Sequence, residues 1–342
     1  MAERPALGED CRVQQEKRGL SDVVGVDIGG TKVLAGLVAP DGTVTATVRR
    51  ETPHRSKTPD VVEATIVEAV RELTDGRSGL AAVGVGAAGF VDAAGSIVRF
   101  SPHLSWRDEP LKAALESRLG VPVVVDNDAN TTALAEMRFG AGRGYRQVLC
   151  VTLGTGIGGA LVLDGDVFRG GNGMAGEFGH MQVMPGGRRC ECGNRGCWEQ
   201  YSSGNALVRE ARELVAAESP TAFLLRDLVV GDVSRLTGPV VTEAARAGDP
   251  AAGELFDEIG SWLGTGLANL AAAFDPEVIV VGGGVSEAGD LLLDPAREAL
   301  RKSLTGRGFR PEPPVVRAAL GPDAGFIGAA VLARERAARP QV

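Results

Sequence analysis

Apolar residues recur along the chain in two periods, one typical of strands and one typical of helices. Residues 23–48 read as an apolar strand, a Gly-Gly-Thr turn, a second strand, a turn at Asp41-Gly42 and a third, alternating strand. Residues 59–73 carry apolar side chains at helical spacing, and residues 80–91 read as a buried strand that ends in Ala87-Ala88-Gly89. The N-terminal part of the chain therefore predicts the strands and helices of an α/β unit.

A second predicted helix and strand lead into a polar cluster. Residues 108–119 read as a helix that Gly120 stops, and residues 121–125 as a strand. The strand runs into Asp126-Asn127-Asp128-Ala129-Asn130, and residues 131–137 predict the next helix. Polar side chains are thus expected at the end of a buried strand.

Residues 148–167 repeat the plan of the first segment, because they read as a strand, a Gly-Thr-Gly turn, a strand and a second tight turn. Residues 205–273 are mostly helical by pattern, and Asp275-Pro276 breaks the helix. Residues 278–281 form a buried strand that runs into three glycines, and a final helix follows Asp323, a suitable N-cap. Two copies of one unit predict an internally duplicated α/β protein.

Length and charge narrow the class of protein. At 342 residues the chain can bury a sizeable core and predicts two domains. Its 36 lysines and arginines against 44 aspartates and glutamates give a net charge of −8, with the basic residues scattered, so we expect neither nucleic acid nor membrane as a partner. No apolar run is long enough to cross a bilayer. Residues 1–21 lack the apolar central region of a signal peptide and predict a mobile tail.

The five cysteines fall into different settings. Cys11 lies in the predicted tail, and Cys150 lies in an apolar strand pattern that predicts the core. The other three, Cys190, Cys192 and Cys197, lie within eight positions. Thiolate ligands together with two unpaired cysteines are typical of a reducing compartment, so we expect a cytoplasmic protein.

His180 precedes these three cysteines in a His-x9-Cys-x-Cys-x4-Cys pattern. Three thiolates and one imidazole complete a tetrahedral zinc shell without a vacant position, which predicts a structural Zn²⁺ ion. The alternative is a set of buried free thiols, with His180 in an ordinary loop. Glu177 and Glu199 flank the pattern, so a bound ion would position both carboxylates.

Three glycine-rich turns each follow a predicted buried strand. Glycine lets backbone N–H groups approach phosphate oxygens, and hydroxyls or a lysine add donors. A single such turn is more often only a tight turn, but the three together favour a nucleotide. None fits the P-loop or the Rossmann pattern, so neither class is expected. The turns are Gly29-Gly30-Thr31-Lys32, Gly154-Thr155-Gly156 and Gly282-Gly283-Gly284.

Two aspartates stand at predicted strand ends. Asp27 comes just before the first glycine turn, where a carboxylate suits either a magnesium–phosphate group or an ordinary turn cap. Asp128 could accept the proton of an attacking hydroxyl, which is the role of an aspartate in kinases. Alternatively, it could cap the next helix. If Asn130 provides that cap, Asp128 is left free for chemistry.

Five motifs give the chain a family resemblance. V-D-I-G-G-T-K, D-N-D-A-N, L-G-T-G-I-G-G, G-E-F-G-H and C-E-C-G-N-R-G-C-W-E-Q-Y resemble motifs of the ROK family of sugar kinases and related repressors, from about residue 23 to residue 330. The resemblance implies an actin-like ATPase/sugar kinase fold, internally duplicated, with two lobes around a central cleft. Residues 22–127 and a C-terminal helix at about 322–338 would form a small α/β lobe. Residues 128–321 would form the large lobe, with the zinc loop at 180–197.

The same resemblance implies a reaction and roles for single residues. The motifs are most similar to those of bacterial glucokinases, which implies ATP-dependent phosphorylation of glucose at the 6-hydroxyl with Asp128 as general base. ATP and Mg²⁺ would be bound by Asp27 and the three glycine turns. Families of this kind often have Pro-Gly where this chain has Ala88-Gly89. The sugar would be held by Gly89, Asn127, Asp128, Glu177, His180 and Glu199.

Several alternatives stay open at the level of sequence. A kinase for another hexose or for an N-acetylhexosamine would share all of these residues. A sugar-sensing repressor would need a helix-turn-helix domain ahead of the kinase-like part, and only about 20 residues precede the first strand. The phosphoryl donor could be ATP or polyphosphate. The resemblance also implies a homodimer or a dimer of dimers.

Overall fold

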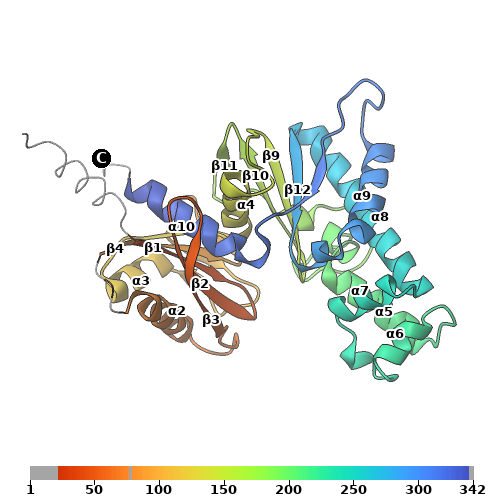
Figure 1. Ribbon diagram of the computed structural model, residues 1–342, viewed down its shortest axis with the longest axis horizontal. Coiled ribbons are helices and arrows are strands. Elements are labelled where there is room, and N and C mark those ends of the chain that lie inside the picture. Colours follow the sequence, from red (N-terminus) through yellow and green to blue (C-terminus); the bar gives the residue numbers. More distant parts are fainter. Residues whose placement is uncertain (1–21, 76, 78, 339–342) are drawn as a thin grey trace, which may run out of the picture. The chain divides into compact units, whose positions relative to one another are not determined.

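The computed structural model describes residues 22–75, 77 and 79–338 of the 342-residue chain. The described chain divides into two compact units, one that runs to Thr132 and resumes at Gly325, and one that comprises Ala133–Ala324. The elements of both units are labelled in Figure 1. The predicted tail, with Cys11, lies outside the described residues.

The first unit is built on a five-stranded sheet. Its strands are β1 (Asp22–Ile28), β2 (Lys32–Val38), β3 (Val44–Glu51), β4 (Leu80–Ala87) and β8 (Val123–Asn127), in the order β3-β2-β1-β4-β8. β1, β2 and β3 form an antiparallel meander, whereas β1, β4 and β8 run parallel. Val24 and Val26 of β1 are fully buried, as the apolar pattern predicted.

Helices cover the two faces of this sheet (Figure 1). They are α2 (Pro59–Thr74) and α3 (Leu111–Leu119) on one side and α10 (Ala324–Ala337) on the other. In α2 the buried residues recur at helical spacing and pack against β2 and β3. On the opposite face Gly25 and Gly84 leave room for α10, because a Cβ on either would lie 1.8 Å from a backbone oxygen of that helix. This helix can therefore lie unusually close to the sheet.

A small antiparallel sheet corrects one sequence prediction. Its strands are β5 (Phe90–Val91), β6 (Val98–Phe100) and β7 (Arg107–Glu109). The helix predicted at 108–119 begins only at Leu111, because β7 pairs with β6 and Pro110 precedes the helix. Gly120 ends α3 in the left-handed conformation, with φ 69°, as predicted.

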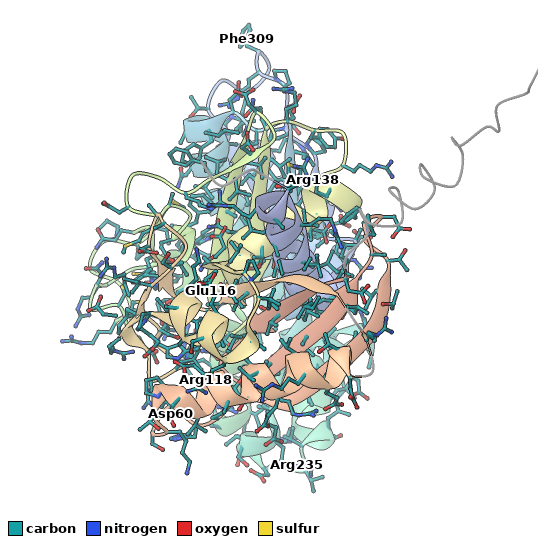
Figure 2. All side chains as sticks on the ribbon, turned by 90° about the vertical axis from the view of Figure 1, so that its left-hand side faces the viewer. Asp60, Glu116, Arg118, Arg138, Arg235 and Phe309 are labelled. Atoms are coloured by element: carbon teal, nitrogen blue, oxygen red, sulfur yellow. The ribbon has the colours of Figure 1, made fainter. Side chains whose placement is uncertain are left out.

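Arg118 fastens α3 to α2. Its Nη1 donates to the carbonyl oxygen of Asp60 at 3.3 Å, and its Nη2 lies 3.0 Å from Oε2 of Glu63. Figure 2 shows Arg118 beside Asp60 on this face of the unit. The Glu63 side chain is only 5% exposed, so the ion pair provides the charge partner that a buried carboxylate needs.

The second unit repeats the plan of the first sheet. Its strands are β9 (Val148–Leu153), β10 (Ile157–Leu163), β11 (Asp166–Phe168), β12 (Val278–Gly282) and β13 (Val315–Arg317), in the order β11-β10-β9-β12-β13. Again the first three strands form an antiparallel meander and the fourth pairs parallel with the first. The predicted duplication is thereby confirmed. Cys150 is buried in β9, and burial raises the pKa of its thiol to about 12.

Five helices complete the second unit. They are α5 (Gly204–Ala216), α6 (Phe223–Leu228), α7 (Gly238–Arg246), α8 (Pro250–Phe274) and α9 (Asp290–Ser303). The first four confirm the helical pattern at 205–273, whereas α9 was not predicted. Gly264 of α8 faces the backbone of Ala296 in α9, where a Cβ would lie 2.1 Å from the carbonyl oxygen. Among the helices that the structure describes, none is both long and apolar enough for a membrane span.

We expect Gly84→Ala to destabilise the protein by about 3 kcal/mol, because the new methyl group must push α10 off the sheet. Gly253→Ala is the matched control, since a Cβ at this helical glycine meets nothing within 4 Å and should be neutral or stabilise by about 0.5–1 kcal/mol. Urea unfolding of the two variants measures the difference. Equal midpoints would show that the close approach of α10 is not needed.

Candidate functional site

The predicted residues of the first unit collect at one edge of its sheet. β1, β4 and β8 are parallel neighbours, with Ile28 paired to Ala87 and Ala87 paired to Asn127. Since parallel strands end at the same sheet edge, the residues that follow these strands lie close to one another. They are the Gly29–Lys32 turn, Gly89 and Asp128. This edge is where a ligand is expected in an open α/β sheet.

Asn127 joins two of these strand ends. Its Oδ1 accepts hydrogen bonds from the backbone N–H of Ala129 (2.8 Å) and of Asn130 (3.2 Å), so it caps helix α4 (Asp128–Phe139). Its Nδ2 donates to the carbonyl oxygen of Gly89 at 3.1 Å. The Asn127 amide also lies against the Asp128 carboxylate, where its hydrogen bond opposes the rise in the pKa of Asp128.

The proposed cap at Asn130 is wrong. The helix starts three residues earlier than that cap requires, and the Asn130 side chain lies buried inside it, where Nδ2 donates to Oδ1 of Asp126 at 2.8 Å. Asp128 is nevertheless not needed as the N-cap, as expected, because Asn127 caps the helix. Local sequence could not choose between two asparagines three positions apart.

Gly89 explains why the strand predicted at 80–91 is interrupted. The residue has φ +140°, and a Cβ on it would lie 2.3 Å from the carbonyl oxygen of Phe100. The preceding Ala88 carbonyl accepts a hydrogen bond from the Ser101 hydroxyl at 2.7 Å. The turn is thus held in a conformation that only glycine adopts readily.

Two carboxyl groups at the sheet edge are shifted toward the protonated form. Burial and the neighbouring Asp128 carboxylate raise the pKa of Asp27 to about 7, and Lys32 opposes the rise. Burial also raises the pKa of Asp128, against the N–H of Ala129 and the charge of His103. Asp128 is therefore a stronger base than an exposed aspartate. A cation near Asp27 would relieve the repulsion between the two carboxylates.

The first glycine turn is closed by a hydrogen bond from Gly29 N–H to the Lys32 carbonyl at 3.0 Å. The Thr52 hydroxyl donates to the Gly29 carbonyl at 2.8 Å and fixes the turn against the end of β3. Gly30 packs on His103, whose Cβ would lie 2.9 Å from a Cβ at that glycine. A larger residue than glycine has no room there.

The structure brings the other two glycine turns together in the second unit. β9 and β12 run parallel, with Thr152 paired to Gly282, so both turns follow the same sheet edge. Gly283 has φ +83°, and a Cβ on it would lie 2.4 Å from the Leu153 carbonyl oxygen. The Gly154 carbonyl accepts from Gly204 N–H at 2.8 Å, which places the start of α5 against its turn. Backbone N–H groups at a helix start suit an anion.

His180, Cys190, Cys192 and Cys197 come together as the spacing predicted. One potential ligand atom from each lies within 4.8 Å of the others. The Cys192 and Cys197 sulfurs are 3.6 Å apart, and the Cys190 sulfur is 3.6 Å from His180 Nδ1. A tetrahedron with Zn–S bonds of about 2.3 Å has edges of roughly 3.8 Å, so the donor set and its spacing fit zinc.

Two one-turn helices carry the carboxylates that flank this cluster. η1 (Phe178–His180) follows Glu177, and η2 (Trp198–Gln200) contains Glu199. His180 turns Nδ1 toward the cysteines and Glu199 (Oε1 at 3.6 Å), and Nε2 toward Glu177 (Oε2 at 3.9 Å). The ring therefore has one nitrogen for a metal and the other for a second partner.

Glu199 also reaches the Gly154–Gly156 turn. A Cβ on Gly156 would lie only 2.4 Å from Oε2 of Glu199, while Oε1 lies 3.0 Å from the Cys190 sulfur. The carboxylate is thus confined between the metal-ligand cluster and a turn that the sequence assigned to the nucleotide. A side chain at Gly156 would therefore displace the Glu199 carboxylate. The glycine motif by itself does not reveal this contact.

Sequence reasoning missed His103 and the residue that positions it. Arg107 Nη1 donates to the carbonyls of Ser101 (2.7 Å) and Trp106 (2.6 Å), and its guanidinium lies 4.1 Å from the centre of the Phe100 ring. These contacts hold the loop that carries His103 against the first glycine turn. The only signal in the sequence was one histidine in a short polar segment, which is too common to select.

Comparison with known proteins identifies the family. The profile described as "ROK family" matches residues 23–336. The chain belongs to the ROK family. The glucokinase of Streptomyces coelicolor is 47% identical, over 91% of this chain and 97% of that protein.

Solved ROK structures match the fold along almost the whole chain. A ROK family glucokinase from Streptomyces griseus, in complex with glucose and AMPPNP, has a TM-score of 0.85 at 47% identity and covers 92% of this chain and 99% of that one. A ROK hexokinase from Thermus thermophilus has a TM-score of 0.73 at 35% identity, with 92% and 98% covered. The predicted ROK sugar kinase fold is confirmed.

We expect Cys192→Ser to lose bound zinc, because the change removes one of four ligands. The affinity for zinc should fall by more than about 100-fold, which exceeds the usual cost of losing an outer partner of a ligand. Metal content after dialysis against a weak chelator measures this loss. Glu191→Gln, an exposed non-ligand in the same loop, is the control. Stoichiometric zinc in Cys192→Ser would remove this cysteine from the site.

Proposed function

We propose that this chain is an ATP-dependent glucokinase, which transfers the γ-phosphoryl group of ATP to the 6-hydroxyl of D-glucose. The observation that carries the proposal is the 47% identity to Streptomyces glucokinases along nearly the whole length of both chains. The solved relative that contains glucose and AMPPNP supports these two substrate classes. The glycine turns and Asp128 follow buried strands, and Glu177, His180 and Glu199 lie in the segment between β11 and α5.

Asp128 is proposed as the general base. Its carboxylate accepts the proton of the 6-hydroxyl as that oxygen forms a bond to the γ-phosphorus. The bond from the γ-phosphorus to the bridging oxygen breaks, ADP leaves, and Asp128 later returns the proton to solvent. Burial raises the pKa of Asp128, which makes its carboxylate a stronger proton acceptor than an exposed aspartate.

The remaining polar groups orient the sugar. The groups proposed for this task are Asn127, the Gly89 backbone, Glu177, His180 and Glu199. Carboxylates suit sugar hydroxyls because each oxygen accepts hydrogen bonds. Zinc on Nδ1 would leave His180 Nε2 protonated, as a donor toward a hydroxyl. We infer that zinc organises the sugar site and has no contact with the phosphate.

The three glycine turns are proposed to bind the nucleotide, with Asp27 nearest to its metal. Mg²⁺, when bound, would offset the negative charge of the phosphates. Asp27 fits a magnesium–phosphate group because its pKa of about 7 reflects burial and a second carboxylate, two conditions that a cation reverses. Lys32 adds a positive charge at the same turn.

The decisive experiment is an assay of ADP release with ATP and Mg²⁺ across glucose, mannose, fructose, N-acetylglucosamine and N-acetylmannosamine. We expect the highest kcat/KM with glucose, because the two relatives named above with 47% identity are glucokinases. An acetamido sugar as the best substrate would contradict the assignment of glucose and leave the kinase assignment standing. The absence of turnover with every sugar would contradict both.

Asp128→Asn serves as the control of the same assay. The amide cannot accept the proton, so kcat should fall by about 10²–10⁴-fold while the KM for glucose changes little. Far-ultraviolet circular dichroism should be unchanged, because Asn127 rather than Asp128 caps α4. Normal kcat in this variant would exclude Asp128 as the base.

We expect Gly156→Ala to raise the KM for glucose by about 10-fold or more, and by a larger factor than it raises the KM for ATP. The added methyl displaces the Glu199 carboxylate, and a hydrogen bond to a charged group contributes about 1.5–3 kcal/mol. Gly154→Ala is the control, because a Cβ there meets nothing within 4 Å. A rise in the KM for ATP alone would assign Gly156 to the nucleotide instead. Zinc content should be unchanged in both variants.

A further inference from the structure

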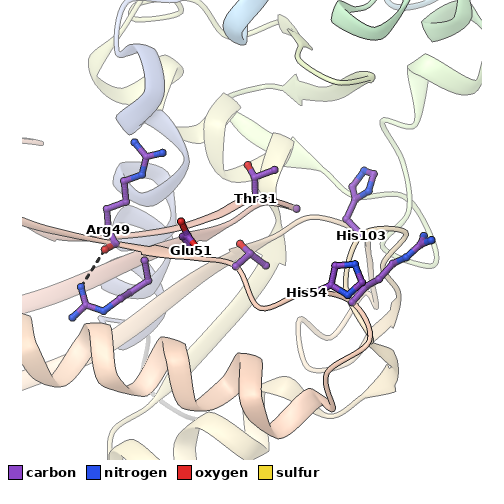
Figure 3. A pocket seen from close by; sticks show the side chains of 9 residues that line it. Thr31, Arg49, Glu51, His54 and His103 are labelled. Atoms are coloured by element: carbon purple, nitrogen blue, oxygen red, sulfur yellow. Dashed lines mark hydrogen bonds between the residues drawn. The ribbon is translucent and has the colours of Figure 1, made fainter. Parts of the chain in front are cut away.

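Helix α6, labelled in Figure 1, carries a surface of the second unit that has no role in the proposed reaction. The open pocket of about 610 Å³ in Figure 3 differs from it in this respect, because Gly30 and Thr31 line that pocket and it therefore adjoins the first glycine turn. The α6 surface contains none of the residues proposed for the sugar, the nucleotide or the metal.

The inner side of α6 is fixed to the core of the second unit. Ala222, Leu225 and Val229 are buried in its hydrophobic cluster. The Asp249 carboxylate accepts hydrogen bonds from the N–H groups of Leu224 (2.8 Å) and Leu225 (3.1 Å), so it caps the helix from the start of α8. The outer side of α6 is therefore held in one position.

The outer side of α6 carries exposed residues at helical spacing, which we call the α6 stripe. Its members stand at positions i, i+3, i+4 and i+7, and they are Phe223, Arg226, Asp227 and Val230. An apolar residue stands at each end of the stripe, and two opposite charges stand between them. Neither Arg226 nor Asp227 forms an ion pair with any residue that the structure describes.

Val230 has a backbone conformation that is unfavourable for its side chain. Its φ is +52°, in the left-handed region, which a β-branched residue rarely adopts. Hydrogen bonds from Val230 N–H to the Asp227 carbonyl (3.1 Å) and from Gly231 N–H to the Arg226 carbonyl (3.0 Å) form a helix end that usually has glycine at this position. The Val230 side chain is 80% exposed, so burial within the chain does not offset this cost. An apolar contact with another molecule would offset it.

The α6 stripe is complementary to a second copy of itself. When two stripes meet antiparallel around a two-fold axis at the midpoint between Arg226 and Asp227, each residue faces the one equally far beyond the midpoint. Arg226 of each copy then meets Asp227 of the other. Phe223 and Val230 are also equally far from the midpoint, so the same arrangement places each phenyl ring against a valine. One register thus pairs the charges and covers both apolar ends.

We propose that the α6 stripe is a homodimer contact, whose partner is a second copy of this chain. The contact is isologous, because each copy contributes the same residues. Each copy has a net charge of −8, but distant charges are screened within about 8–10 Å at ordinary salt, so the charges at the contact set its register. The stripe is short, and we therefore expect weak, reversible association with a Kd on the order of 100 µM.

Sedimentation equilibrium of the full chain, without sugar or nucleotide, tests the contact from about 5 to about 500 µM protein. We expect the wild type to self-associate. Arg226→Glu and Asp227→Arg should each weaken self-association by at least about 10-fold, because either change places like charges opposite each other in both halves of the contact. An equimolar mixture of the two variants should restore it. In that mixture the new carboxylate of one variant faces the new guanidinium of the other.

Val230→Gly separates the contact from folding. Glycine adopts the left-handed conformation without strain, so at low protein concentration this variant should melt at the wild-type temperature or above it. Its self-association should nevertheless be weaker by about 10-fold, since both valines of the contact are lost. Phe223→Ser, at the other end of the stripe, should weaken self-association by at least the same factor.

Arg307→Glu and Phe309→Ser are the matched controls, because both residues are exposed in the loop after α9 (Figure 2 labels Phe309), away from α6 in Figure 1. Both variants should self-associate as the wild type does. Three results would overturn the contact: no self-association of the wild type, undiminished self-association of the α6 variants, or a mixture of the two charge variants that associates no better than either alone. Because sugar and nucleotide are absent, none of these results bears on the proposed function.

Discussion

The parallel pairing of β1 with β4 and β8, and of β9 with β12, is the constraint on which the rest of each unit depends. Parallel strands end together, so residues far apart in sequence meet beyond their carboxyl ends. Parallel strands also need helical crossovers on the sheet faces. The other face of the first sheet is covered by α10, the last helix of the described chain, which approaches the sheet closely because Gly25 and Gly84 carry no side chains.

The cluster of His180 and the three cysteines lies in a segment of the second unit that has little regular secondary structure. Between β11 and α5 the chain has only the one-turn helices η1 and η2, so no strand ladder or long helix can hold Glu177 and Glu199. A metal ion bound by the four potential ligands would add a constraint there. Glu199 is confined between this cluster and Gly156, so the cluster, the carboxylate proposed to hold the sugar and a turn proposed to bind the nucleotide form one contiguous set of contacts within this unit.

The charge close to the proposed phosphate site differs from the net charge of the whole chain. The proposed nucleotide is a polyanion, whereas the chain has a net charge of −8, and distant charges are screened within about 8–10 Å at ordinary salt. Charged groups close to the proposed phosphate site, such as Lys32 at the first turn, therefore matter more than the net charge of the chain. Asp27 and Asp128 are the acidic groups at the same sheet edge. Burial raises the pKa of both carboxyl groups, so a further negative charge is favourable there only together with a cation.

The sequence by itself determined most strands of the two five-stranded sheets, the duplication, the grouping of His180 with three cysteines and the family, because each depends on short-range periodicity or on a dense local motif. It failed where several local solutions have similar energies: either asparagine could cap α4, and residues 108–110 suit a helix as well as an edge strand. Only the tertiary structure decided these cases, through the pairing of β7 with β6 and the Asn127 contact with Gly89. It alone also placed Glu199 against Gly156 and Thr52 beside Thr31, since contacts between residues far apart in sequence leave no periodic signal.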